Sequence, residues 1–212
     1  DIYTDGVISG FEAVRAKGGE KARAHSRLIM GPWVHGIDQL KNGQLEFPAA
    51  HYFGMKKARA FIDYWVRGVP NGIDKTEAPI TYFQMGTNEW RTTESWPPKD
   101  SREHAYYFSN DKTLSTQTAK ADAAPLTFRY DAANPAPTVG GHVLTPELQP
   151  GPADQREKVE SRSDVLVFNT PVLEKDLAIT GKVKLENAVE QGFDALTDPN
   201  SAHLKILVEA PS

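Results

Sequence analysis

Cysteine is missing from all 212 residues of the sequence. Its absence excludes disulfide bonds, thiol catalysis and metal sites with cysteine ligands, and it leaves the compartment open between cytoplasmic and secreted. Long apolar runs are missing as well, because none approaches the ~20 residues that a membrane-spanning helix needs. Runs of Lys and Arg are absent too, and the formal net charge is -4. The sequence therefore argues against nucleic acids and membranes as partners.

An initiator methionine is also missing, since the chain opens on the letters DIYTDGVISGF. These letters are typical of the interior of a longer domain, and we expect that an N-terminal part of the same protein precedes them. The chain also ends soon after an expected strand, so we expect the last domain to be incomplete. Strands at such cuts present unpaired edges, which pair readily with another chain. The missing N-terminal part is therefore an expected partner, and the sequence leaves a homo-oligomer open.

Residues 1–98 alternate between helix patterns and short apolar runs. Two segments carry apolar residues at helical spacing, which predicts two amphipathic helices. Two short apolar runs closed by glycine predict buried strands. Helices that alternate with strands are typical of an α/β domain with a mostly parallel sheet. The expected order is helix 6–17, strand 26–31, loop 32–48, helix 49–67 and strand 80–86.

The pattern changes after Pro97 and Pro98, and residues 99–212 contain no convincing helix pattern. Short apolar runs separated by turn residues predict an all-β domain, a β-sandwich of the jelly-roll kind that is incomplete. The sequence thus predicts two domains, an α/β domain at residues 1–98 followed by an all-β domain at residues 99–212. The expected strands are AYYF, LTFRY, DVLVFNT, LAITGKVKLE and LKILVEA.

The stretch RLIMGPWVHG, residues 27–36, places His35 just beyond an expected strand. Catalytic side chains of α/β enzymes lie in loops at the carboxyl ends of strands, and a histidine with an ordinary pKa of about 6.5 can act as a general base. Such a histidine needs an orienting carboxylate, which in α/β-hydrolases comes earlier in the chain. Asp1 and Asp5 are the early carboxylates that fit. The alternative is that His35 only packs or caps a loop.

A nucleophile is missing from this set, since no serine has the Gly-x-Ser-x-Gly frame of a nucleophile elbow. The residues alone therefore offer a base and an acid. The other histidines lack neighbours at ligand spacing, so we expect no metal site. His51 stands where a helix is expected to begin, and a capping or exposed role is expected for it. Gly140 and Gly141 resemble a phosphate loop but precede no expected helix, so they predict a turn.

Longer segments give the sequence a more specific resemblance. The chain resembles the C-terminal portion of the cocaine esterase and X-Pro dipeptidyl-peptidase family of serine hydrolases, also called CocE/NonD acyl esterases. GPWVHG resembles the family's catalytic-histidine loop, and DIYTDGVISGFEAVRA resembles the segment after its acid turn. The stretch KGGEKARAH and the residues after about Leu185 depart from the family pattern. Further likeness lies in ARAFIDYWVRG, ITYFQMGTNEWRTTESWP, YDAANPAPTVGG and GPADQREKVESRSDVLVFNTPVLEKDLAITG.

The resemblance implies roles for individual residues. His35 corresponds to the family's catalytic base, and Asp1 corresponds to its triad acid, because that acid closes a Gly-Trp-Tyr-Asp turn before a helix. Asp5 falls where this helix begins, and the expected role is that of an N-cap. Trp33 is expected to pack the loop that positions His35, and its alternative role is substrate binding in the acyl pocket.

The resemblance further implies a hydrolase that cleaves an ester or amide through an acyl-enzyme, without a metal or an organic cofactor. The family's nucleophilic serine, oxyanion tyrosine and helical cap domain come earlier than the first residue of this sequence. We therefore expect the segment alone to be inactive. The expected substrate is a small-molecule ester or amide, or a peptide. The alternative hypothesis is a non-catalytic β-sandwich binding module with a degenerate hydrolase remnant.

Overall fold

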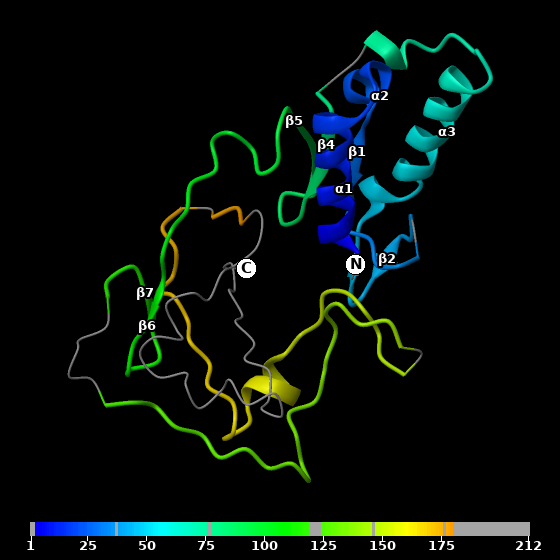
Figure 1. The fold of residues 1–212 in the computed structure, drawn as a ribbon. Coiled ribbons are helices and arrows are strands. Elements are labelled where there is room, and N and C mark those ends of the chain that lie inside the picture. The colour runs from blue at the N-terminus through cyan, green and yellow to red at the C-terminus, as the bar shows by residue number, and fades with distance from the viewer. Residues whose placement is uncertain are drawn as a thin grey trace. The chain divides into compact units, whose positions relative to one another are not determined.

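The chain folds into two compact units, which Figure 1 shows as ribbons. Unit 1 comprises Asp1–Asp100 and Thr138–Asp154, and unit 2 comprises Ser101–Pro137 and Gln155–Ser212. The expected domains 1–98 and 99–212 stay a prediction, but residues 138–154 lie with unit 1. The structure is a computed structural model, and it describes residues 3–36, 38–75, 78–118, 124–145, 147–175 and 177–179.

Unit 1 begins with two helices, α1 (Thr4–Lys17) and α2 (Glu20–His25). The helix expected at residues 6–17 is thus confirmed. It ends at Gly18, where an added Cβ would lie 2.5 Å from the carbonyl oxygen of Val14. The second helix was not predicted, because a helix of six residues is too short to show an apolar period.

A sheet of three strands follows, with the order β1-β4-β5. Strand β1 (Leu28–Met30) pairs in parallel with β4 (Ile80–Gln84), and β4 pairs antiparallel with β5 (Glu89–Thr93). Helix α3 (Phe53–Trp65) lies between β1 and β4 in the chain, as a parallel pair requires a crossover. The two expected strands and the second expected helix are confirmed with shorter bounds, whereas β5 was not predicted.

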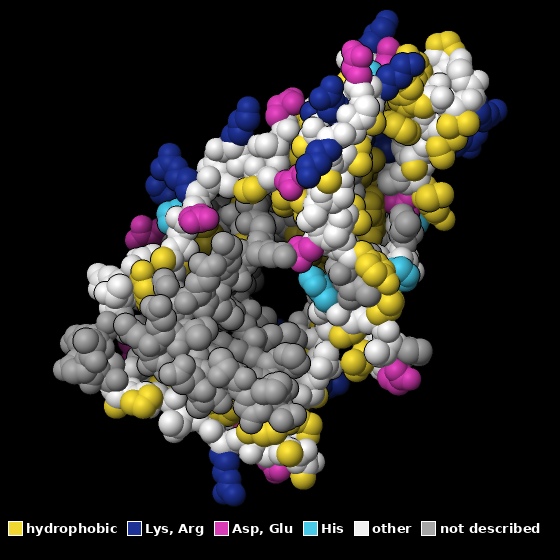
Figure 2. Space-filling model, viewed as in Figure 1, with side chains coloured by type: hydrophobic (Ala, Val, Ile, Leu, Met, Phe, Trp, Pro, Cys, Tyr) yellow, Lys and Arg dark blue, Asp and Glu magenta, His cyan; other side chains and the backbone are white. Residues whose placement is uncertain are grey.

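Helix α3 leads into a short 3-10 helix, η2 (Ile73–Lys75). Tyr64 forms a hydrogen bond with Asp74, and this bond raises the pKa of the tyrosine. The apolar stripe that predicted helix α3 is largely exposed. Figure 2 shows these apolar side chains gathered over the helix and the residues beside it. The exposed apolar residues of the helix are Met55, Ile62 and Trp65, and those beside it are Tyr52, Val66 and Val69.

The segment expected as loop 32–48 contains a small hairpin, β2 (Lys41–Asn42) and β3 (Leu45–Glu46), followed by η1 (Pro48–Ala50). Its turn packs on the backbone of residues 138–154. The N–H of Gln44 donates to the carbonyl of Pro152 over 2.9 Å. Gly43 has a φ of 58°, and an added Cβ there would lie 2.2 Å from the same carbonyl oxygen. Glycine is therefore required where the hairpin meets this later segment.

The core of unit 1 is a cluster of aromatic side chains. Phe47, Ala50 and Phe83 are buried, and Trp33 and Trp90 pack against them. Phe47 meets Phe83 edge to face at 5.8 Å between ring centroids, and Trp90 stacks on Phe53 at 3.8 Å. The core thus joins strand β4, strand β5 and the start of α3.

The described part of unit 2 contains less regular structure. Strands β6 (Tyr107–Phe108) and β7 (Leu114–Ser115) form a two-stranded sheet, and η3 (Arg156–Glu160) is a single π-helical turn. The strand expected at AYYF is confirmed in part by β6. The strands expected at LTFRY and DVLVFNT are wrong, except that Asn169 makes one bridge to Thr113. Most of LAITGKVKLE and all of LKILVEA lie outside the described residues.

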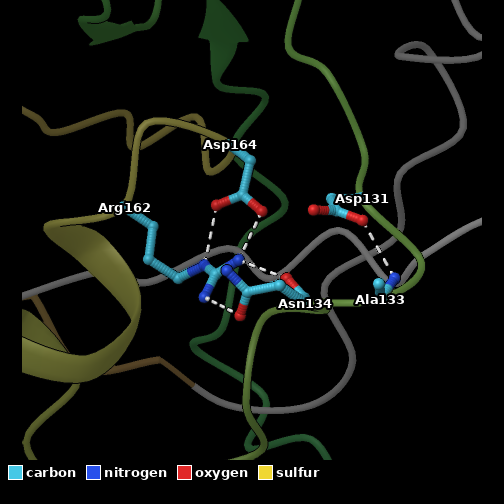
Figure 3. A network of polar contacts seen from close by, with 5 residues as sticks. All are labelled: Asp131, Ala133, Asn134, Arg162 and Asp164. Atoms are coloured by element: carbon cyan, nitrogen blue, oxygen red, sulfur yellow. Dashed lines mark hydrogen bonds and ion pairs between the residues drawn. The ribbon is translucent and has the colours of Figure 1, made fainter.

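A polar network holds part of unit 2 together, as Figure 3 shows. The guanidinium of Arg162 donates to both carboxylate oxygens of Asp164, over 2.7 and 2.6 Å. The same group donates to the backbone and side-chain oxygens of Asn134, over 2.6 and 3.3 Å. Hydrogen bonding to Arg162 lowers the pKa of Asp164, and the same bond raises the pKa of Arg162. The chain thus ties residue 134 to residues 162–164 without a sheet.

Candidate functional site

The loop after β1 carries His35, and the packing of Trp33 holds this loop in place. The indole N–H of Trp33 donates to the carbonyl of Ala50 over 3.3 Å. An added Cβ at Gly31 would lie 2.5 Å from the Trp33 ring, and one at Gly54 would lie 2.8 Å from it. Two glycines therefore make room for this indole, one before it in the loop and one in the first turn of α3. The structure supports the expected packing role of Trp33.

His35 is exposed in this loop. Its ring lies 5.6 Å from the ring of Tyr3, measured between centroids, with a tilt of 54°. Tyr3 stands at the N-cap position of α1. The start of α1 therefore lies beside the imidazole, and this is the part of the sequence that holds both candidate acids.

Asp38 joins the same loop to helix α3. Its carboxylate accepts hydrogen bonds from the N–H groups of Gly54, over 2.9 Å, and of Met55. Both donors lie in the first turn of α3, where N–H groups have no partner within the helix. Asp38 is buried and has a positive φ of 62°. A carboxylate at a helix N-terminus is favoured by both hydrogen bonding and the helix dipole.

Asn42 forms hydrogen bonds within the same loop, on both sides of His35. Its side-chain oxygen accepts from the N–H of Val34 over 3.4 Å, and its side-chain nitrogen donates to the carbonyl of Gln39 over 3.3 Å. Asn42 is among the largest fully buried side chains, with 1% of its surface exposed. Gly151 packs closely against the loop, because an added Cβ there would lie 3.1 Å from a methyl group of Val34.

The expected site residues have different outcomes. His35 lies at the carboxyl end of a strand, as expected. Asp1 lies outside the described residues, so its role stays a prediction. The expectation that Asp5 is an N-cap is wrong, because Tyr3 holds that position and Asp5 lies in the first helical turn. A substrate-binding role for Trp33 stays a prediction.

Sequence reasoning missed Asp38 and Asn42. A capping residue is normally read from the position just before its helix, whereas Asp38 lies 16 residues before the N–H that it binds. Asn42 lies in a stretch that resembles an ordinary polar loop. Only the position of Asp38, three residues after a histidine singled out by its motif, could have drawn attention to it.

Within the described residues, His, Asp and Glu side chains form no group of three that could hold a metal ion. Their helices also include none with the length and apolar character needed to cross a membrane.

A family comparison matches residues 71–192, more than half of the chain. The matched family is the X-Pro dipeptidyl-peptidase C-terminal non-catalytic domain. The match begins after α3 and ends beyond the last described residue. His35, Asp38 and Asn42 therefore precede the region to which the term non-catalytic applies.

Among curated proteins, the chain is similar to the cocaine esterase of Rhodococcus sp. (strain MB1 Bresler). The two are 31% identical over 214 aligned residues, which cover 92% of this chain. The alignment covers 37% of the esterase, so the chain spans little more than a third of that relative.

Two solved structures have a similar fold. One is an aminopeptidase from a marine sediment archaeon, Thaumarchaeota archaeon, with a TM-score of 0.66 and 24% identity. It matches 82% of this chain and 29% of its own chain, and it bears on the fold alone. The other is an alpha-amino acid ester hydrolase, with a TM-score of 0.52 and 27% identity over 68% of this chain and 24% of that one.

Proposed function

We propose that this chain supplies the base and the acid of a serine hydrolase. The chain belongs to the cocaine esterase and X-Pro dipeptidyl-peptidase family, as a C-terminal portion of it. The observation that carries the proposal is the placement of His35. It is exposed in a loop at the carboxyl end of β1, and the N-terminal end of α1 lies beside it. This is the position from which α/β enzymes present working side chains.

In this mechanism His35 moves protons, and a serine from an earlier segment of the protein is the nucleophile. His35 takes the proton of the serine hydroxyl while the serine oxygen bonds to the carbonyl carbon of the substrate. The imidazolium then gives that proton to the leaving alcohol or amine as the bond to the carbonyl carbon breaks. Water then attacks the carbonyl carbon of the acyl-enzyme while His35 takes its proton. The serine oxygen leaves with that proton, which releases the carboxylic acid product and restores the serine. Asp1 holds the imidazole in the required tautomer and stabilises its charged form.

The fold of the proposed enzyme follows the same division of the chain. Residues 1–98 would form the C-terminal part of an α/β-hydrolase domain, and the parallel pair β1 and β4 with its α3 crossover supports this. Residues 99–212 would form a jelly-roll domain that is incomplete. The substrate is an ester, an amide or a peptide, and the chemistry uses no metal or organic cofactor.

A partner is proposed on the basis of exposed apolar surface. Val7 and Val14 of α1 and Met55 and Ile62 of α3 are exposed, although amphipathic helices normally bury such positions. An N-terminal part of the same protein is the proposed cover, and it would also supply the serine. A second copy of the chain is the competing cover, which the molecular mass in solution would reveal.

The test uses the complete gene product with p-nitrophenyl butyrate as substrate and a fluorophosphonate as probe. The protein is expected to turn over the ester and to be labelled on one serine. His35→Ala is expected to lower kcat by about 10⁴-fold or more, because the base acts as a unit with the nucleophile. His51→Ala is the matched control, since His51 is another exposed histidine of unit 1, outside the loop. Full activity of His35→Ala would overturn the proposal.

A non-catalytic binding module is the second candidate, and the description of the matched family favours it for residues 71–192. This alternative predicts neither labelling nor turnover in the complete protein. It also predicts that His35→Ala leaves every binding property unchanged. The same two assays therefore separate the two functions.

A further inference from the structure

We propose that Asp38 and Asn42 are positioning residues for His35, which they hold in place by fixing the backbone of its loop on both sides. The proposal rests on the proposed function, since it treats His35 as the catalytic base. Neither residue belongs to the expected triad. Both are polar and almost fully buried, with 3% and 1% of their surfaces exposed. Buried polar side chains of this kind are costly unless every group is paired.

The first attachment joins the loop to a rigid helix. Both oxygens of Asp38 accept N–H groups from the first turn of α3, at Gly54 and Met55. These bonds satisfy donors that the helix itself cannot satisfy. They also fix residue 38, which follows His35 by three positions, to an element of 13 residues. Hydrogen bonds to a charged acceptor are stronger than neutral ones, so this attachment is expected to be the firmer one.

The second attachment closes the loop on itself. The Asn42 oxygen accepts from the N–H of Val34, the residue directly before His35, and its nitrogen donates to Gln39. Asn42 also belongs to strand β2, whose turn is fixed by residues 149–154 through Gln149 and Gln44. The backbone on the N-terminal side of His35 is thereby joined to a hairpin.

The two attachments act on the backbone of the loop, and the imidazole of His35 is the group that exchanges protons. A general base must meet its partner within hydrogen-bond distance, and a misplacement of about 1 Å can cost roughly a hundredfold in rate. Removing either attachment lets the loop shift without changing any group that touches the substrate. The expected effect is therefore on kcat rather than on KM.

The experiment measures kcat and KM of the complete protein for p-nitrophenyl butyrate. Asp38→Ala and Asn42→Ala are each expected to lower kcat about 10- to 100-fold with KM changed less than about 3-fold. Asp38→Asn keeps one oxygen acceptor for the helix and is expected to recover part of the loss. The rate of fluorophosphonate labelling is expected to fall in parallel, because it uses the same base.

Controls separate positioning from folding. Each kcat is divided by the number of labelled sites, so unfolded protein does not enter the rate. Asn71→Ala is the matched control, because Asn71 also bonds a backbone carbonyl, that of Ala60, and lies outside the loop. It is expected to keep the wild-type kcat.

The outcomes distinguish this inference from the proposed function. If His35→Ala is inactive while Asp38→Ala and Asn42→Ala keep the wild-type kcat per labelled site, the positioning role is wrong and the function stands. If His35→Ala is fully active, the function itself is wrong. A loss for both alanine variants with partial recovery in Asp38→Asn supports the positioning role.

Discussion

The contacts inside unit 1 differ in kind from those inside unit 2. Unit 1 has a mixed sheet and a connected group of buried and half-buried rings, which includes Phe47, Phe83 and Trp90. The described part of unit 2 has one two-stranded sheet and a network of charged and amide groups around Arg162. The difference shows that apolar runs of similar length in one chain do not lead to the same kind of core. In unit 1 two of these runs, β1 and β4, pair with each other in a sheet, whereas the runs LTFRY and DVLVFNT of unit 2 form no strand.

The largest expected effect comes from truncating the core of unit 1. Phe83→Ala is expected to lower the free energy of unfolding by about 3 to 5 kcal/mol, because it removes a buried ring and leaves a cavity. Phe108→Ala is the matched change in unit 2, where a partly buried ring contacts Phe168. It is expected to cost less. Urea denaturation of the complete protein measures both, and equal losses would remove the contrast between the units.

A smaller effect is expected from two helical glycines of unit 1, and the two should differ in sign. Gly54→Ala places a methyl group 2.8 Å from the Trp33 ring, so the ring must move. Overpacking of this kind costs about 1 to 3 kcal/mol. Gly10→Ala lies in α1 with nothing within 4 Å, and it is expected to stabilise the protein by about 1 kcal/mol. Thermal melts check the pair, and destabilisation by both variants would contradict the steric explanation.

The smallest effect concerns the charges of unit 2. Because Arg162 lowers the pKa of Asp164 in the folded state, the pair stabilises the fold above the ordinary carboxyl pKa of about 3.9. This contribution is lost as the pH falls through the lowered pKa of the folded protein. Asp164→Asn is therefore expected to be slightly less stable than wild type near neutral pH, and the difference should disappear in strong acid.

Urea denaturation at a series of pH values checks this expectation. Glu157→Gln is the control, since Glu157 lies exposed on η3 and its side chain has no part in the network of Figure 3. A difference between Asp164→Asn and wild type that stays constant from neutral pH into strong acid would contradict the ion-pair explanation.

The sequence predicted some elements of this chain well and others poorly. The helices at α1 and α3 and the strands at β1 and β4 follow directly from apolar spacing and glycine stops. The strands expected at LTFRY and DVLVFNT are absent from the described residues there. A short apolar run satisfies a strand pattern, but a strand also needs a neighbour with which to pair. That neighbour cannot be read from the run itself.

The sequence by itself determined the motif that places His35 after a strand, the family and the glycines that punctuate the first half of the chain. Only the tertiary structure decided what holds the His35 loop in place. Asp38 bonds a helix turn 16 residues later, and Gln149 bonds the carbonyl of Gly43 across 106 residues. Local propensity acts over a few residues, whereas such partners are brought together by folding of the whole unit. The place of His35 in the chain is therefore given by its motif, whereas the contacts that hold its loop come from distant parts of the chain.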